Sequence, residues 1–178
     1  MSKLLNSILE LNNVEVSTSD LYKKWLRECY LHAQKSNHPT TKVAALLISE
    51  EKIVLKGRNV LPNGVEEVPE RFEGDNRHLY PNHAERDLIY KAAKKGVKTA
   101  KKTLVTPLHP CLQCANAIIS SGISTVILHQ QKVERTRKGW QQEMMEAAKV
   151  LNEAGVRVIL FNGTVGVDSF MHGEKWRA

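Results

Sequence analysis

The chain has 178 residues, 42% of them hydrophobic and 25% charged, which is enough for one domain with a buried core and no disulfide support. Its formal net charge of +7 suits a partner that carries phosphate, although a lysine-rich solvated surface gives the same number. No apolar run approaches the length of a membrane span, and three cysteines, two of them in a Cys-x-x-Cys, do not form a disulfide framework. We therefore expect a cytoplasmic protein without a membrane segment or signal peptide.

The first half of the chain predicts a helix, a hairpin and a long loop. Residues 20–36 form the helix, because apolar side chains recur there at helical spacing: Tyr22, Leu26, Cys29 and Ala33. Residues 42–49 and 53–60 are apolar segments separated by a short charged turn, which is typical of two antiparallel strands. Residues 61–82 are rich in turn residues, and a loop of this length in a compact domain is more often functional than idle.

Helices and strands alternate in the second half. The hydrophobic pattern predicts helices over residues 83–96, 111–122 and 139–155, and strands over residues 102–107, 124–129 and 156–162. This alternation favours an α/β sandwich whose sheet is parallel in its later part. We expect a single domain over residues 1–178, with its core in residues 20–163 and a tail, residues 164–178, that shows no clear periodicity.

Two cysteines at the start of a predicted helix indicate a metal site. Cys111 and Cys114 are three residues apart, so both sulfurs lie on one helix face, and the positive end of the helix dipole favours their thiolate form. His83 and Glu85 stand where another helix should begin, and from a first turn both side chains can reach an ion beyond the helix end. Cys-x-x-Cys alone also occurs in zinc ribbons and redox proteins, whereas the combination is far more specific.

Counting donors favours an open site. A structural zinc ion normally has four protein ligands, while a catalytic one has three and a water. The remaining thiol, Cys29, falls inside the first long helix and suits a small core position. We therefore expect three protein donors and one free position.

These residues match the signature H-x-E…P-C-x-x-C of the zinc-dependent deaminases. Over residues 20–163 the chain resembles, in order and spacing, the deoxycytidylate (dCMP) deaminase branch of the cytidine/deoxycytidylate deaminase superfamily. The phage-type members of that branch resemble it most in the "GW…AGV" segment. The segments that carry this resemblance are "HPTTKVAALLI", "GRNVLPNGV", "NHAE", "TLVTPLHPCLQCANAIISSGISTVIL" and "GWQQEMMEAAKVLNEAGVRVILFNG". Two positions depart from the branch, which usually has Gly-Tyr-Asn-Gly at residues 57–60 and Asn at Asp87.

The resemblance implies a fold and a reaction. The fold is a cytidine-deaminase-like three-layer α/β/α sandwich with a five-stranded mixed sheet. The reaction is the hydrolysis of dCMP to dUMP and ammonia at one Zn²⁺ held by His83, Cys111 and Cys114. Glu85 then takes a proton from water, passes it to ring N3 and delivers a proton to the departing ammonia.

The resemblance also suggests substrate contacts. Asn59 matches an asparagine that contacts the sugar hydroxyl and the base, and the backbone N–H of Ala84 suits the base O2. Other candidates border the base or meet the phosphate, and each also fits an ordinary loop or surface residue: His109, Pro110, Lys42, Arg58 and Arg86. Tyr80 and Trp140 either line the pocket or pack, and packing is favoured for Trp140.

The branch further implies a homo-oligomer, commonly a hexamer, regulated by dCTP and dTTP with Mg²⁺ through residues 58–64. A phage-encoded protein of this kind works in the host cytoplasm. The departures at Arg58 and Val60 leave this regulation open.

A free cytidine deaminase is disfavoured, because its metal motif normally departs further from this one. Two other rival functions remain. An adenosine deaminase that acts on tRNA shares the signature and suits the charge of +7, but the long loop between Asn59 and His83 and the "LHPC" segment favour a mononucleotide over nucleic acid. A non-catalytic zinc module that binds nucleotides is the second alternative, and such a module has no use for Glu85. A 5-modified dCMP or dCTP also stays open as the substrate.

Overall fold

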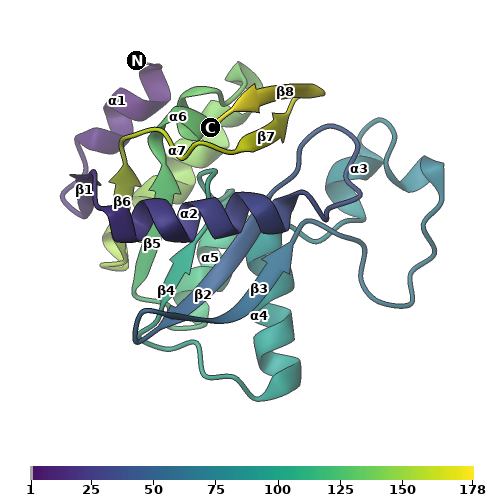
Figure 1. The fold of residues 1–178 in the computed structure, drawn as a ribbon, viewed down its shortest axis with the longest axis horizontal. Helices are drawn as coiled ribbons and strands as arrows, with labels where there is room; N and C mark the ends of the chain where they lie inside the picture. The colour runs from purple at the N-terminus through teal and green to yellow at the C-terminus, as the bar shows by residue number, and fades with distance from the viewer. Residues whose placement is uncertain (1) are drawn as a thin grey trace.

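The computed structural model describes residues 2–178 and contains a central mixed sheet covered by helices on both faces (Figure 1). Within these residues the sheet has six strands in the order β1-β6-β5-β4-β2-β3. Their bounds are β1 Val14–Ser17, β2 Ala44–Ser49, β3 Lys52–Arg58, β4 Thr103–Val105, β5 Thr125–His129 and β6 Arg157–Phe161. Strand β2 runs antiparallel to β3 and β4, and the remaining pairs are parallel, so the predicted fold class and mixed sheet are confirmed.

The prediction of five strands is wrong by one. Strand β1 extends the sheet beyond β6, with Val14 opposite Val158 and Ser17 opposite Phe161. The Asn13 side chain secures this edge by donating from Nδ2 to the Val156 carbonyl at 2.7 Å. The strand is only four residues long, and its partner lies far along the chain, so a local hydrophobic pattern gives little sign of it.

Side chains on successive sheet residues point to opposite faces and build two cores. On one face, the larger core holds alternate residues of β2 and β6 such as Leu47 and Leu160, packed under α1, α4, α5 and α7. On the other face, Leu46 and Ile159 pack under α2, which crosses the sheet in Figure 1. The helices are α1 Lys3–Leu9, α2 Asp20–Ala33, α3 Asn76–Leu79, α4 Ala84–Lys95, α5 Leu112–Ser120, α6 Gln130–Glu134 and α7 Lys138–Glu153, with a 3₁₀ turn, η1, at Pro69–Arg71.

The C-terminal tail forms a separate hairpin. Strands β7 (Asp168–Met171) and β8 (Glu174–Arg177) pair antiparallel with each other and lie beside α2 (Figure 1). Ala178 is fully buried in the core under α2, so this segment is tied to the body of the molecule. Within residues 2–178, no helix is both long and apolar enough to span a membrane.

The ends of several strands lie together at one end of the sheet. Because β3 and β4 both run antiparallel to β2, their carboxyl ends and the start of β2 lie at this same end. Asn59 follows β3 there, Thr106 follows β4, and Val43 precedes β2. The carboxyl edge of an α/β sheet is where ligands usually bind.

Candidate metal centre and its pocket

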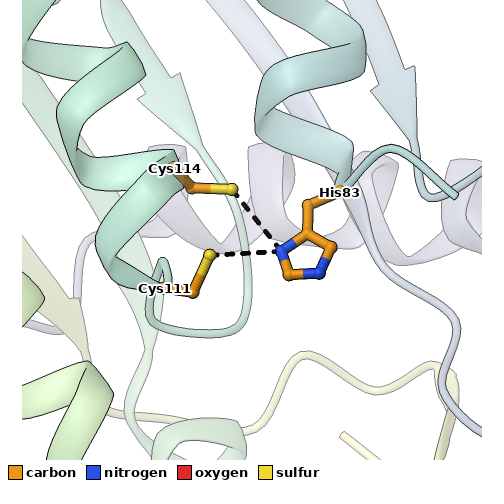
Figure 2. A group of neighbouring side chains, drawn as sticks. All are labelled: His83, Cys111 and Cys114. Atoms are coloured by element: carbon orange, nitrogen blue, oxygen red, sulfur yellow. Dashed lines mark hydrogen bonds between the residues drawn. The ribbon is translucent and has the colours of Figure 1, made fainter. Parts of the chain in front are cut away.

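Two helix N-termini bring three metal-binding side chains together (Figure 2). His83 is the N-cap residue of α4, Cys111 is the N-cap residue of α5, and Cys114 lies in the first turn of α5. The Nδ1 atom of His83 is 3.3 Å from the Cys111 sulfur and 3.5 Å from the Cys114 sulfur. All three donor atoms lie within 4.8 Å of one another, as the sequence predicted.

This donor set fits a zinc ion. In a tetrahedral site with Zn–S near 2.3 Å and Zn–N near 2.0 Å, nitrogen and sulfur donors are roughly 3.6 Å apart, close to the separations seen here. Among residues 2–178 the donor group has three members, so no fourth His, Cys, Asp or Glu closes it. The third cysteine, Cys29, is buried in α2, where its thiol contacts the Ala44 carbonyl at 3.2 Å.

The surroundings of the two thiols shift their pKa values in opposite directions. A hydrogen bond from Cys114, followed by the nearby His83, lowers the pKa of Cys111 to about 4. The same hydrogen bond raises the pKa of Cys114, because that thiol is the donor. These shifts favour a thiolate at Cys111, which is the form that binds metal.

Glu85 stands next to the donor group but outside it. Its side chain is 5% exposed, and Oε1 accepts a hydrogen bond from the Thr106 hydroxyl at 3.5 Å. Burial is the main cause that raises the pKa of this carboxyl above its usual value. A buried carboxyl with a raised pKa is suited to accept a proton and give it back.

The cavity in front of His83 and Glu85 is built from six parts of the chain. They are the loop before β2, Asn59 after β3, the segment from α3 to the start of α4, the loop before α5, the start of α7 with Thr136 before it, and the turn of the C-terminal hairpin. Besides His83, Glu85 and Cys111, the lining residues are His38, Thr40, Thr41, Val43, Asn59, Arg77, His78, Pro81, Ala84, Leu108, His109, Thr136, Arg137, Trp140, Met144, Met171 and His172.

Three of the predicted substrate contacts lie in this lining, namely Asn59, Ala84 and His109. The amide of Asn59 is already engaged with the backbone, because Nδ2 donates to the Thr41 carbonyl at 2.7 Å and Oδ1 accepts from the Val43 N–H at 2.9 Å. Asn59 therefore shapes the loop before β2, in addition to bordering the cavity.

His109 is neutral at pH 7. Its Nδ1 donates to the Pro110 carbonyl at 2.9 Å, and burial lowers the pKa of the imidazole to about 4. The ring therefore contributes no charge to the cavity wall.

The other predicted contacts stand elsewhere within residues 2–178. Pro110 and the three cations Lys42, Arg58 and Arg86 lie outside the lining of this cavity. The Lys42 ammonium reaches the Gln34 carbonyl at 3.4 Å, and the Arg86 guanidinium donates to Gln113 at 3.1 Å. Their roles as substrate contacts stay predictions.

Two arginines line the cavity that were not predicted from the sequence. Arg77 comes from the long loop, whose length hinted at function, and Arg137 is the N-cap residue of α7. His78 and Trp140 join these two walls through an edge-on contact, with ring centroids 5.0 Å apart. Nothing in the tail sequence pointed to Met171 and His172.

Comparison with known proteins decides the family. Residues 19–130, more than half of the chain, match the family described as "Cytidine and deoxycytidylate deaminase zinc-binding region". The chain belongs to this deaminase family. Its zinc-binding region includes the cluster of His83, Cys111 and Cys114, so the protein is a zinc-binding deaminase of that family.

This deaminase has relatives of known name. It is 31% identical to the deoxycytidylate deaminase of Homo sapiens over 157 residues, which is 82% of this chain and 84% of the relative. It is 32% identical to the deoxycytidylate deaminase of Pongo abelii over 133 residues, or 68% and 74% of the two chains. The dCMP deaminase of cyanophage S-TIM5, solved in complex with dCMP and dUMP, shares the fold, with a TM-score of 0.62, 21% identity, and coverage of 80% of this chain and 97% of the other.

Proposed function

We propose that this deaminase hydrolyses dCMP to dUMP and ammonia. The observation that carries the proposal is the composition of one cavity: two members of the three-donor metal cluster, His83 and Cys111, line it together with a buried carboxyl and two arginines. The relatives named above support the choice of dCMP, because the two at 31% and 32% identity are deoxycytidylate deaminases.

The protein residues divide the reaction between them. His83, Cys111 and Cys114 hold one zinc ion, which supplies Lewis-acid activation of water when bound. Glu85 takes a proton from the attacking water on a carboxylate oxygen and passes it to ring N3. The water oxygen forms a bond to C4 as N3 is protonated. Glu85 then takes the remaining proton from that oxygen and delivers it to the amino nitrogen as the C4–N bond breaks, so that ammonia leaves and the oxygen stays on C4.

The cavity also has groups that suit a phosphate. Arg77 and Arg137 supply two guanidinium groups, and Arg137 also marks the N-terminus of the sixteen-residue helix α7. Guanidinium groups and helix N-termini both favour phosphate oxygens. We infer that a nucleotide binds here with its base at Glu85 and its phosphate near Arg137.

Other features stay predictions. They are a single domain over residues 1–178, a homo-oligomer with a hexamer favoured, regulation by dCTP and dTTP with Mg²⁺, and a cytoplasmic location.

A substrate panel tests the proposal. Ammonia release is measured for zinc-loaded protein with dCMP, 5-methyl-dCMP, dCTP, deoxycytidine and a tRNA anticodon stem, with and without a chelator. We expect the highest kcat/KM for dCMP and loss of turnover after zinc removal. Release from the tRNA stem alone would assign the tRNA adenosine reaction instead, and zinc-loaded protein that releases ammonia from none of these would contradict the proposal.

A further inference from the structure

The C-terminal hairpin reaches into the substrate cavity. Met171, at the end of β7, and His172, in the turn to β8, line the same space as His83 and Glu85. The hairpin lies outside residues 19–130, the part that matches the family. This wall of the cavity is thus an addition of the chain to the zinc-binding region.

Contacts outside the hairpin fix its position. An isolated two-stranded hairpin is only marginally stable, so β7 and β8 need such support. The backbone N–H of His172 donates to the Thr41 hydroxyl at 3.2 Å, and that of Gly173 donates to the Thr40 carbonyl at 2.8 Å. These bonds tie the turn to the loop before β2, which Asn59 also holds.

The buried side chain of Lys132 adds a second anchor. Its ammonium donates to the Ser169 hydroxyl on β7 at 3.1 Å and to the Lys42 carbonyl at 3.2 Å. It also lies 5.1 Å from the centre of the Tyr30 ring. One cation thereby connects α6, the hairpin and the loop before β2.

The turn also holds the start of α7. His172 Nε2 donates to the Arg135 carbonyl at 2.9 Å, which fixes the tautomer because a carbonyl only accepts. The Arg137 guanidinium donates to the His172 carbonyl at 3.4 Å. His172 therefore meets the segment around Arg137 through both its ring and its backbone.

We propose that the turn at His172 is a specificity element that positions Arg137 for the phosphate of the substrate. This inference rests on the proposed function, and it adds that the hairpin makes the enzyme prefer a nucleoside monophosphate over the unphosphorylated nucleoside. His172 acts here as a positioning residue, through Arg137. Misplacing a charged contact weakens only ligands that carry its partner, so the effect falls on dCMP and spares deoxycytidine.

The variant His172→Gly tests the inference with little disturbance of the backbone. His172 has φ of 60°, which glycine adopts without strain, so the turn is kept while the imidazole is removed. We expect kcat/KM for dCMP to fall about tenfold, mainly through KM, and kcat/KM for deoxycytidine to stay within about twofold. Calorimetric Kd values for dUMP and deoxyuridine should show the same selective loss.

Two further variants serve as controls. Glu51→Gly changes another exposed residue with positive φ, 61°, in the β2–β3 turn, and should leave both substrates unaffected. Arg137→Gln should reduce the preference for dCMP at least as much as His172→Gly, and the double variant should match Arg137→Gln alone.

The outcomes separate the two proposals. Equal losses for both substrates in His172→Gly, an unchanged preference for dCMP, or additive losses in the double variant would each overturn the positioning role. A folded, zinc-loaded wild type that does not deaminate dCMP would contradict the proposed function. In that case the binding of dUMP against deoxyuridine still decides the role of the turn.

Discussion

His83, Glu85 and Cys111 lie at the N-termini of two helices, and this position lets each side chain extend beyond the helix end. His83 and Cys111 are both N-cap residues, with extended backbone angles that turn the side chain away from the helix body. A separation of two residues would send His83 and Glu85 to different faces inside a helix. At the N-terminus of α4, both side chains instead border one cavity.

The variant Glu85→Gln tests proton transfer at the residue scale. The amide has nearly the same size as the carboxyl but cannot carry a proton between water, N3 and ammonia. We expect kcat for dCMP to fall by at least about 100-fold, while the zinc content stays at one ion per chain. The measurements are ammonia release and metal analysis of the same sample. Turnover equal to wild type would remove Glu85 from the mechanism.

The metal donors were predictable at this scale, and the cations of the cavity were not. Spacing within "NHAE" and "HPCLQC" is local information, and the structure brings His83, Cys111 and Cys114 together as predicted. Arg77 lies in α3 and Arg137 is the N-cap residue of α7, two segments that are distant in sequence and meet only in the folded chain. Nothing in the residues next to these arginines distinguishes them from surface cations such as Arg86.

At the scale of elements, the contact between β3 and α4 sets the position of the site. A Cβ atom on Gly57 would lie 2.4 Å from the Ala84 carbonyl oxygen and 2.7 Å from the Leu88 nitrogen. Both are backbone atoms of α4 and cannot move alone. The first turn of this helix carries Glu85, so the absence of a side chain at Gly57 lets α4 approach the sheet.

Gly57→Ala should therefore damage both stability and activity. We expect the free energy of unfolding to fall by about 1–3 kcal/mol and kcat/KM for dCMP to fall with it, because α4 must shift. Gly139→Ala is the matched control, because Gly139 is a helical position in α7 at which an added Cβ atom would meet nothing within 4 Å. It should be neutral or stabilising by up to about 1 kcal/mol. Chemical denaturation compares the two, and an unaffected Gly57→Ala enzyme would refute the close-packing argument.

The Lys132 anchor predicts a dependence of stability on pH. Burial lowers the pKa of Lys132 to about 8, below its usual 10.5. The unfolded chain then holds this proton more tightly than the folded chain, so the cost of burying the charge is fully present below pH 8 and disappears as pH rises toward 10.5. In Lys132→Met this cost is absent at every pH.

The wild type should accordingly gain stability relative to Lys132→Met between pH 7.5 and 10, by up to roughly 3 kcal/mol. Denaturant unfolding at several pH values measures the difference. Lys94→Met, a change of an exposed lysine on α4, is the control and should show a flat difference from wild type. A flat difference for Lys132→Met as well would mean that the lysine does not titrate in this range.

Across the whole molecule, the sequence predicted the central helices and strands of the sandwich better than strand β1 and the C-terminal hairpin. Helices α2, α4, α5 and α7 and strands β2 to β6 follow strong periodic patterns and short connections, and they appear within a few residues of the expected bounds. Strand β1 and the C-terminal hairpin depend on contacts with distant parts of the chain. The hairpin is held by residues of the loop before β2, α6 and α7, which no local pattern reveals.

For the whole molecule, the proposed activity depends on a zinc site that the N-termini of α4 and α5 form with three protein donors and one exchangeable position. Zinc K-edge X-ray absorption on the purified, metal-loaded protein tests it most directly. We predict two sulfur neighbours and two lighter nitrogen or oxygen neighbours per zinc ion, unchanged in Glu85→Gln and depleted of sulfur in Cys111→Ala. A shell with three or more sulfurs, or with none, would contradict the account.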